Sequence, residues 1–486
     1  MMRTARTRYG DFSQRVRRHR PSELLIALAQ TSVAMYEQDA WLSDRIRFPW
    51  AIAAAAKASI VGGNEHRARG VTEKDVLQIC SVYNELDSPL ASAPLDTSET
   101  VGAFLVRTSF EQFRYQQSHF EEISRVGAMF ENVDTLPTEI LDSALIERLL
   151  GCSLERFVVA GFILAASTQA NAGFFDPTWP SLREGAGPIE PHFSVDTVRQ
   201  VFEEQFLGSF DQVRADSKKA EQPDIRLRHH EFNPLVSRPF VTLPDGRHIA
   251  PQPHFVFQRL SASALYFAAV DALDKAQVNA FTRDIGVVSQ EYVGRQLQLI
   301  PNGSVLPEIV YDGDQRSIDW FVIFDELVVL IEVKSTRMSH LARMGGNKLE
   351  ADVQRCIGKA YGQVARTNGL LNDGHPSFAA IPTDRPRIAI VATLEPYWGA
   401  NSQFLGEFLP EPPIATTVAS LRALERLVDV LRAVGDPSPL LEVLADPDRR
   451  TWNIEIALPD VRTSKNPLLA AAWDRLPWPS SRSPTS

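Results

Sequence analysis

The chain has 486 residues, a formal net charge of −10 and a hydrophobic fraction of 44%. This length predicts two or three domains, and the hydrophobic fraction excludes a disordered chain. The three cysteines, Cys80, Cys152 and Cys356, are far apart and form no Cys-x-x-Cys pair. They exclude a disulfide framework and a thiolate zinc site, and they fit a cytoplasmic protein. We expect no membrane partner, because no apolar stretch reaches the roughly 20 residues that a spanning helix needs.

Residues 1–228 are predicted to form a mostly helical domain. Apolar residues recur at helical spacing, and loops rich in Pro, Ser and Gly separate the helical segments. These segments are 21–38, 72–86, 143–168 and 194–207. The domain shows no catalytic constellation. Recognition, regulation and oligomerisation all stay open for it, through a second copy of the chain or a regulatory partner.

The sequence pattern changes at residues 229–274. Short apolar stretches alternate with the turn signal PDG at 244–246, and a helical segment follows at 261–273. We expect a β-hairpin and a helix that connect the helical domain to the next domain and pack on its core.

Residues 275–400 are predicted to form a mixed-sheet core covered by helices, because helical and strand patterns alternate there. The patterns are a helix at 281–300, a hairpin at 318–335, a helix at 350–367 and a strand at 386–394. Residues 401–460 are expected to be a C-terminal strand and helix extension with an amphipathic helix at 415–434, and 461–486 a poorly ordered tail. The fold class is therefore α/β, or α+β over the whole chain.

The hairpin IDWFVIFDELVVLIEVKS holds three charged residues inside two apolar runs: Asp319, Glu332 and Lys334. Burying unpaired charge costs several kcal/mol or more, so the charges need an explanation. If Asp325 and Glu326 form the turn, Asp319 lies directly opposite Glu332 on the facing strand. Facing residues project from the same side of an antiparallel pair, and Lys334, two residues further on, shares that side.

Two opposed carboxylates repel each other unless a cation lies between them. Oxygen ligands suit Mg²⁺ or Mn²⁺, and a neighbouring lysine can stabilise an oxyanion. Two acids, a lysine and a hard divalent ion together suit phosphodiester hydrolysis. The alternative is an exposed strand whose Glu-x-Lys is a solvated ion pair. The strand LVVLIEVKS is too apolar on both faces for that alternative.

At these residues the chain resembles the PD-(D/E)xK phosphodiesterase superfamily, which has the restriction-endonuclease-like fold. Asp319 matches the acid of the second core strand, and Glu332-Val333-Lys334 matches Glu-x-Lys. The resemblance implies metal binding by Asp319, Glu332 and the Val333 carbonyl, with Lys334 in catalysis. It covers only residues 275–400, and Ile318 replaces the Pro of the family's name.

The resemblance implies further roles for the two helices that flank the hairpin. Glu291 borders the buried stripe of the first helix and either reaches the metal or makes a salt bridge. Arg355, Lys359 and Gln363 fall at i, i+4 and i+8 on one face of the second helix. In this superfamily that face contacts the scissile phosphate or the flanking backbone, and a solvated face is the alternative.

A local basic patch lies between the active strand and the end of the second helix. Residues 336–366 contain six Lys or Arg against two acids, which favours nucleic acid as a partner. The residues expected to contact nucleic acid are Arg337, Arg343, Lys348, Arg355, Lys359 and Gln363.

The sequence therefore predicts a divalent-metal-dependent endonuclease that hydrolyses DNA with Mg²⁺ or Mn²⁺. Its architecture resembles bacterial defence or restriction effectors, including antiviral ones. One alternative is a catalytically silent scaffold that binds nucleic acid or protein. Another is a metal-dependent phosphoesterase acting on RNA or nucleotides. Few aromatic residues lie among the basic ones, which favours duplex DNA over single strands.

Overall fold

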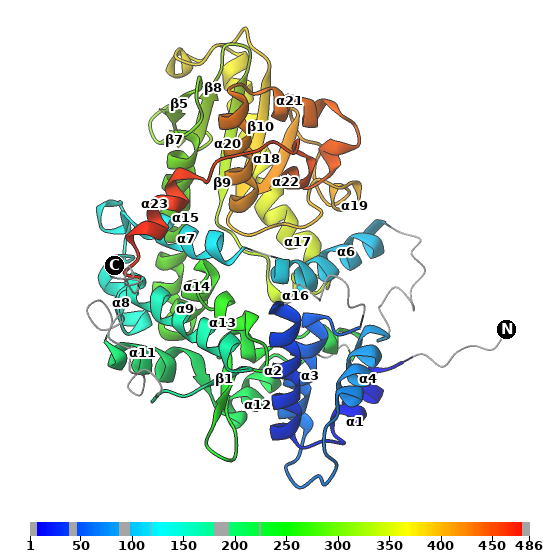
Figure 1. Cartoon of the computed structure of the whole chain (residues 1–486). Coiled ribbons are helices and arrows are strands. Elements are labelled where there is room, and N and C mark those ends of the chain that lie inside the picture. The colour runs from blue at the N-terminus through cyan, green and yellow to red at the C-terminus, as the bar shows by residue number, and fades with distance from the viewer. Residues whose placement is uncertain are drawn as a thin grey trace, which may run out of the picture.

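The computed structural model describes residues 7–37, 46–86, 98–116, 118–178, 194–222 and 225–478. It confirms the α/β class, because helices surround mixed sheets. A five-stranded sheet lies in the upper half of Figure 1, and a smaller four-stranded sheet lies among the N-terminal helices in the lower half.

The N-terminal half is mainly helical, as predicted. Thr72 begins α4 with a capping box, in which its hydroxyl and the Asp75 carboxylate each accept from the other's backbone N–H. The predicted helix at 143–168 is two helices, because Gly151 takes a φ of 80° and ends the first. The helices are α1 (Tyr9–Val16), α2 (Pro21–Glu37), α3 (Pro49–Gly62), α4 (Glu73–Asn84), α6 (Ser98–Gln112), α7 (His119–Phe130), α8 (Ser143–Leu150), α9 (Leu154–Ala170), α11 (Val195–Val201) and α12 (Phe210–Lys219).

One stretch among the described residues, Ser143–Ala170, is long and apolar enough to cross a membrane. It comprises α8 and α9, and 56% of its apolar window is buried inside the fold. Side chains such as Phe157 and Leu164 pack in the largest hydrophobic core. Buried core helices of soluble proteins can be equally long and apolar.

The hairpin at 240–249 belongs to the sheet of the N-terminal half. Its strands β3 (Phe240–Thr242) and β4 (His248–Ile249) pair with β1 (Phe174–Phe175) and β2 (Leu207–Gly208). Two short strands from the helical half thus complete the sheet of this hairpin, and Phe240 of β3 also packs in the hydrophobic core that contains Phe281 and Ile285. The helices that follow are α13 (His254–Gln258) and α14 (Ala262–Ala272).

The five-stranded sheet has the order β11-β10-β9-β8-β5. Strands β9, β10 and β11 are parallel, whereas β8 and β5 are antiparallel to their neighbours. The strands are β5 (Ser304–Pro307), β8 (Trp320–Ile323), β9 (Val328–Lys334), β10 (Arg387–Thr393) and β11 (Thr416–Ser420); the two-stranded ribbon is β6 (Val310–Tyr311) and β7 (Gln315–Arg316).

Strand β11 corrects two predictions. The segment at 415–434 was expected to be one helix, but its first residues form β11 and the helix α20 (Leu421–Val434) starts only afterwards. Thr and Val favour strands, and pairing with β10 selects that state. The core sheet consequently extends past residue 400, where we expected it to end.

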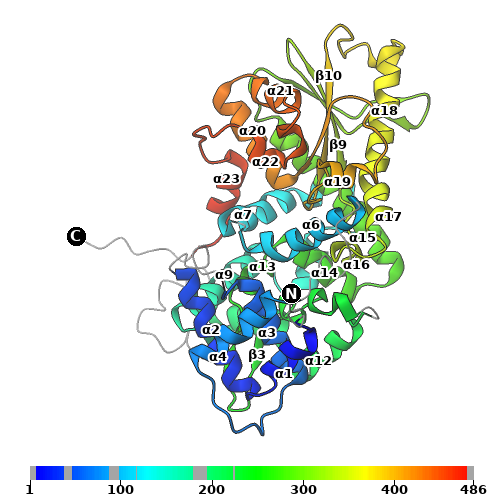
Figure 2. The same cartoon turned by 90° about the vertical axis from the view of Figure 1, so that its right-hand side faces the viewer.

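The alternation of side chains along β9 assigns each face of the sheet. Val329 and Ile331 pack in the core that includes α15 (Lys275–Leu297) and α20, whereas Val328 and Leu330 pack against α18 (Lys359–Asn372). Figure 2 shows β9 and β10 between α20 on one side and α18 on the other. By this alternation Glu332 and Lys334 project from the face that α18 covers.

The C-terminal segment contains a helix where a poorly ordered tail was expected. In α23 (Pro467–Arg475), Leu469 and Ala472 are buried. Asn466, at the start of the helix, donates a 2.9 Å hydrogen bond to Gln296 of α15. Residues 479–486 lie outside the described residues. The other α-helices after β9, besides α18 and α20, are α16 (His340–Arg343), α17 (Leu349–Val353), α19 (Gln403–Gly406), α21 (Ser438–Ala445) and α22 (Ile454–Ala457).

Candidate active site

The hairpin register is the predicted one. Phe324 donates a 2.8 Å hydrogen bond to the carbonyl of Leu327, so Asp325 and Glu326 form a two-residue turn. Trp320 pairs with Ile331 along the strands. Asp319 immediately precedes Trp320, the first residue of β8. It therefore lies beside Glu332, near the end of β9.

Asp319 is bonded to the backbone of the facing strand. Its Oδ2 accepts a 2.6 Å hydrogen bond from the Val333 amide. Glu332 is only 2% exposed, and its Oε2 is a buried oxygen without a hydrogen-bond partner. A buried, unsatisfied carboxylate oxygen is costly, so this atom calls for a cation or a donor.

Lys334 and Gln363 complete the same group. The Lys334 ammonium donates at 2.5 Å to Glu332 Oε1 and at 2.6 Å to Gln363 Oε1. Gln363 lies on α18, the helix that covers this face of the sheet. The structure therefore brings together Asp319, Glu332, Lys334 and Gln363.

The electrostatics of the group favour proton or cation binding. Burial, followed by the charge of Glu332, raises the pKa of Asp319 to about 7. Burial also raises the pKa of Glu332, although the charge of Lys334 opposes the shift. When both are ionised, the half-buried Asp319 and the buried Glu332 carry two negative charges against the one ammonium of Lys334, and a divalent cation would compensate the excess.

Glu308 is a neighbouring acid that the sequence reasoning missed. It follows β5 directly, and Pro307 of β5 pairs with Trp320 of β8, so Glu308 lies beside Asp319. Its charge contributes to the raised pKa of both Asp319 and Glu332. Glu308 itself forms a 2.7 Å ion pair with Arg316. The sequence signal for it is the strand SVLP immediately before this acid, and four residues are too few for its pattern to be detected.

The residues present fit a magnesium-like ion with a small protein ligand set. Asp319, Glu332 and the Val333 carbonyl supply hard oxygen donors, and the unpartnered oxygen of Glu332 is free to bind. No group of three or more His, Cys, Asp or Glu side chains is arranged to hold a metal within the described ranges. Mg²⁺ commonly takes one or two carboxylates and completes its shell with water and substrate phosphate.

The structure does not bring Glu291 into this group. Its carboxylate pairs with Arg295 at 2.9 Å, and Arg295 also contacts Glu131 at 3.0 Å. Helix α15 covers the sheet face that carries Val329 and Ile331, opposite to the face of Glu332. The salt-bridge alternative thus describes Glu291.

Apart from Gln363, which contacts Lys334, the residues expected to contact nucleic acid divide into two groups. Lys348 and Lys359 are exposed, and Arg355 is exposed but pairs with Asp352 at 3.0 Å. A π-helical turn at Gln354–Gly358 precedes α18, so the expected α-helical spacing from Arg355 to Lys359 does not hold.

Arg337 and Arg343 lie elsewhere, in a large cavity between the two halves. Both pair with Glu395, which follows β10. The cavity is not lined by Asp319, Glu332 or Lys334.

No protein-family model matches this chain, and neither a curated protein nor a solved structure is significantly similar to it.

Proposed function

We propose that the protein is a divalent-metal-dependent nuclease that hydrolyses phosphodiester bonds in DNA. The observation that carries the proposal is the convergence of Asp319, Glu332, Lys334 and Gln363 on one face of the sheet. Residues that are distant in sequence meet there, and the single ammonium of Lys334 faces two carboxylates. An exposed, solvated ion pair would not explain a carboxylate that is 2% exposed with an orphan oxygen.

Each residue has a distinct task in this proposal. Asp319, Glu332 and the Val333 carbonyl would hold the ion; when bound, Mg²⁺ or Mn²⁺ neutralises phosphate charge and lowers the pKa of water. The Lys334 ammonium is held between Glu332 and Gln363, where it can stabilise charge that develops on a phosphate oxygen. The hydrogen bond from Val333 fixes Asp319 against the strand that carries the other two residues.

The choice of DNA rests on exposed basic side chains on α18 and in the segment before it. Lys359 is exposed on α18 one turn before Gln363, and Lys348 and Arg366 are also exposed. These charges would contact the phosphates that flank the cleaved bond. Single-stranded RNA would favour stacking aromatics among them, and Tyr361 is buried.

The test is cleavage of supercoiled plasmid DNA by the purified full chain with Mg²⁺ or Mn²⁺. We expect nicking or linearisation that disappears in Lys334→Ala and Glu332→Gln. Lys219→Ala is the matched control, because Lys219 is 78% exposed on α12 and pairs with Asp216.

Undiminished cleavage by Lys334→Ala would refute the assignment of the site. If neither DNA nor RNA is cut with any divalent ion, the scaffold function takes precedence. Titration calorimetry of Mn²⁺ against wild type and Glu332→Gln then reports on the metal alone.

A further inference from the structure

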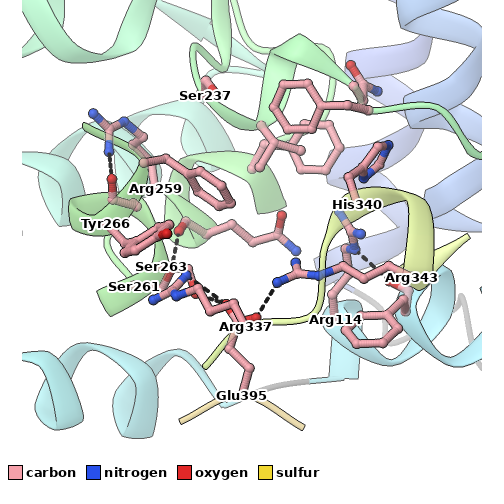
Figure 3. A pocket seen from close by; sticks show the side chains of 18 of the residues that line it. Arg114, Ser237, Arg259, Ser261, Ser263, Tyr266, Arg337, His340, Arg343 and Glu395 are labelled. Atoms are coloured by element: carbon pink, nitrogen blue, oxygen red, sulfur yellow. Dashed lines mark hydrogen bonds and ion pairs between the residues drawn. The ribbon is translucent and has the colours of Figure 1, made fainter. Parts of the chain in front are cut away.

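A cavity of about 1060 Å³ separates the N-terminal half from the ends of strands β9 and β10. Figure 3 shows Arg259 and Tyr266 on one side of it, His340 and Arg343 on the other, and Glu395 between them. The two sides come from different parts of the chain: α13 and α14 on one, and the segment after β9 on the other. A volume of this size accommodates a ligand of nucleotide or dinucleotide size.

Three arginines that line the cavity have no carboxylate within ion-pair distance among the described residues. They donate to neutral oxygens instead: Arg107 to the Met344 carbonyl at 3.5 Å, Arg114 to the Phe110 carbonyl at 2.9 Å and Arg259 to the Ala264 carbonyl at 3.2 Å. Arg107 and Arg259 are 5% and 8% exposed. Burying a guanidinium without a counter-charge is unfavourable, so an anion would relieve the cost.

Arg107 and Arg114 share the charge of one acid, Glu111, which forms an ion pair with neither of these two described residues. Glu111 accepts a 2.5 Å hydrogen bond from the Tyr83 hydroxyl. Burial raises the pKa of Glu111, and the Tyr83 bond and the charges of the two arginines oppose that shift. Burial lowers the pKa of Arg107 to about 10, as expected for a desolvated cation without an ion pair.

Two further arginines share one carboxylate in the cavity. Arg337 and Arg343 both pair with Glu395, and Arg337 Nε is buried without a hydrogen-bond partner. Arg337 and Arg343 therefore carry two positive charges against the single negative charge of Glu395. The planar guanidinium fork is the group that best matches phosphate oxygens.

Aromatic rings lie among these cations. The guanidinium of Arg337 lies 4.3 Å from the centre of the Tyr266 ring, and the rings of His119 and Phe257 stack at 3.7 Å. Phe267, which also lines the cavity, is 43% exposed. Flat aromatic surfaces beside arginines suit a ligand that combines phosphate with a planar ring.

We propose that this cavity binds a small phosphorylated ligand with an aromatic base, of the nucleotide class, and that its occupancy controls the catalytic centre. The control rests on the proposed nuclease function, whereas the binding does not. A polymeric strand is disfavoured, because the cationic groups converge on one cavity instead of following a line across the surface.

The cavity is joined directly to the catalytic strand. Arg337 is three residues after Lys334, and Glu395 is two residues after the end of β10. The Leu394 amide donates a 3.0 Å hydrogen bond to the Lys334 carbonyl, and the Tyr397 hydroxyl donates a 3.0 Å bond to Thr336. A phosphate that replaced Glu395 as partner of Arg337 would therefore act on the segment that holds Lys334.

Binding is tested by titration calorimetry with the full chain in EDTA, using AMP, ATP, the linear dinucleotide pApA, adenosine and inorganic phosphate as probes. Lys334→Ala is titrated alongside, so that the result is independent of cleavage. We expect at least one phosphorylated nucleotide to bind both proteins equally and at least tenfold more tightly than adenosine. Arg114→Gln and Arg259→Gln should each weaken it at least tenfold. Arg283→Gln, an exposed arginine paired with Glu139, should leave it unchanged.

Absence of binding by all three nucleotides overturns the proposal, as does equal affinity for adenosine. Wild-type affinity in both Arg114→Gln and Arg259→Gln overturns it too. Thermal unfolding of the unliganded variants checks that they fold, and the comparison of probes on the wild type does not depend on any variant. An oligonucleotide that binds through these arginines while no mononucleotide competes would identify a substrate channel instead.

Control of the catalytic centre is tested separately on plasmid cleavage. The nucleotide that binds should change the cleavage rate of wild type at least tenfold and leave the rate of Arg259→Gln unchanged. If the nucleotide leaves the cleavage rate of wild type unchanged, the proposed control of the catalytic centre is overturned, but nucleotide binding to the cavity is not. If the protein binds nucleotide but cleaves no plasmid, whether nucleotide is present or absent, the nuclease function is refuted and nucleotide binding in the cavity is not.

Discussion

Asp319 Oδ2 accepts a 2.6 Å hydrogen bond from the amide of Val333, the residue between Glu332 and Lys334. This bond fixes the first acid against the strand that carries the other two charged residues. Because the bond joins the start of β8 to the end of β9, the geometry of the centre depends on the hairpin register. The catalytic proposal therefore makes predictions about stability as well as activity.

Without divalent ions, ionisation of Asp319 should cost the protein stability as the pH rises from about 4 to about 7. Burial, followed by the charge of Glu332, raises the pKa of Asp319 from 3.8 to about 7 in the folded state. At Asp319 the folded state then binds more protons than the unfolded state in this window, so this carboxyl lowers the free energy of unfolding as the pH rises. Histidines such as His119 and His254, whose pKa values burial lowers, act in the opposite direction. The loss that Asp319 causes should be ~1 kcal/mol or more, and the difference between wild type and Asp319→Asn on denaturation in EDTA between pH 4 and 8 measures it.

Asp319→Asn is the matched variant for this pH dependence. It cannot ionise, so its stability should exceed that of wild type at pH 7.5 and approach it at pH 4 when no metal is present. Mg²⁺ should stabilise wild type at pH 7.5 and have little effect on the variant. Parallel pH curves for the two proteins would contradict the raised pKa.

Gln363→Leu should lower kcat by about 10- to 100-fold and change KM by less than about 3-fold. Gln363 accepts a 2.6 Å hydrogen bond from Lys334 and so positions the ammonium, as outer partners position metal ligands. Steady-state cleavage of a short duplex measures both constants. Gln298→Leu is the control, because Gln298 is exposed at the end of α15. An effect confined to KM would indicate a substrate contact instead.

Much of the centre could be predicted because the hairpin is local. A two-residue turn and strict alternation determine which side chains face each other, so the positions of Asp319 and Glu332 followed from the sequence. Gln363 was singled out for helical spacing with Arg355. The π-helical turn at 354–358 breaks that spacing, and hydrophobic periodicity does not reveal a single wider turn.

The other features that the sequence did not predict depend on tertiary contacts. Glu308 follows a four-residue strand whose pattern is too short to detect, and β11 continues without a break into an amphipathic helix. The cavity joins Arg107, Arg259 and Arg337, which are more than 75 residues apart in sequence. No local pattern places such residues together, because long-range packing determines their proximity.

Lys359→Ala should weaken DNA binding and lower the salt slope of log K by about one unit, because one phosphate contact is lost. Arg343→Ala should leave the salt slope unchanged, since Arg343 pairs with Glu395 inside the cavity. Fluorescence anisotropy of a labelled duplex with Ca²⁺ in place of Mg²⁺, between 50 and 200 mM salt, compares them. A reduced slope in Arg343→Ala alone would place the DNA in the cavity and contradict this assignment.

Glu308→Gln should shift the acidic limb of the pH–rate profile to lower pH by about 0.3–1 unit. The charge of Glu308 helps to raise the pKa of Asp319 and Glu332, so its removal lets both acids ionise at lower pH. The initial rate of plasmid nicking at saturating Mg²⁺, measured from pH 5 to 9, gives the shift. Glu326→Gln is the control, because Glu326 is exposed in the hairpin turn and should leave the profile unchanged. Loss of activity at every pH without a shift would instead indicate that Glu308 binds the metal or substrate directly.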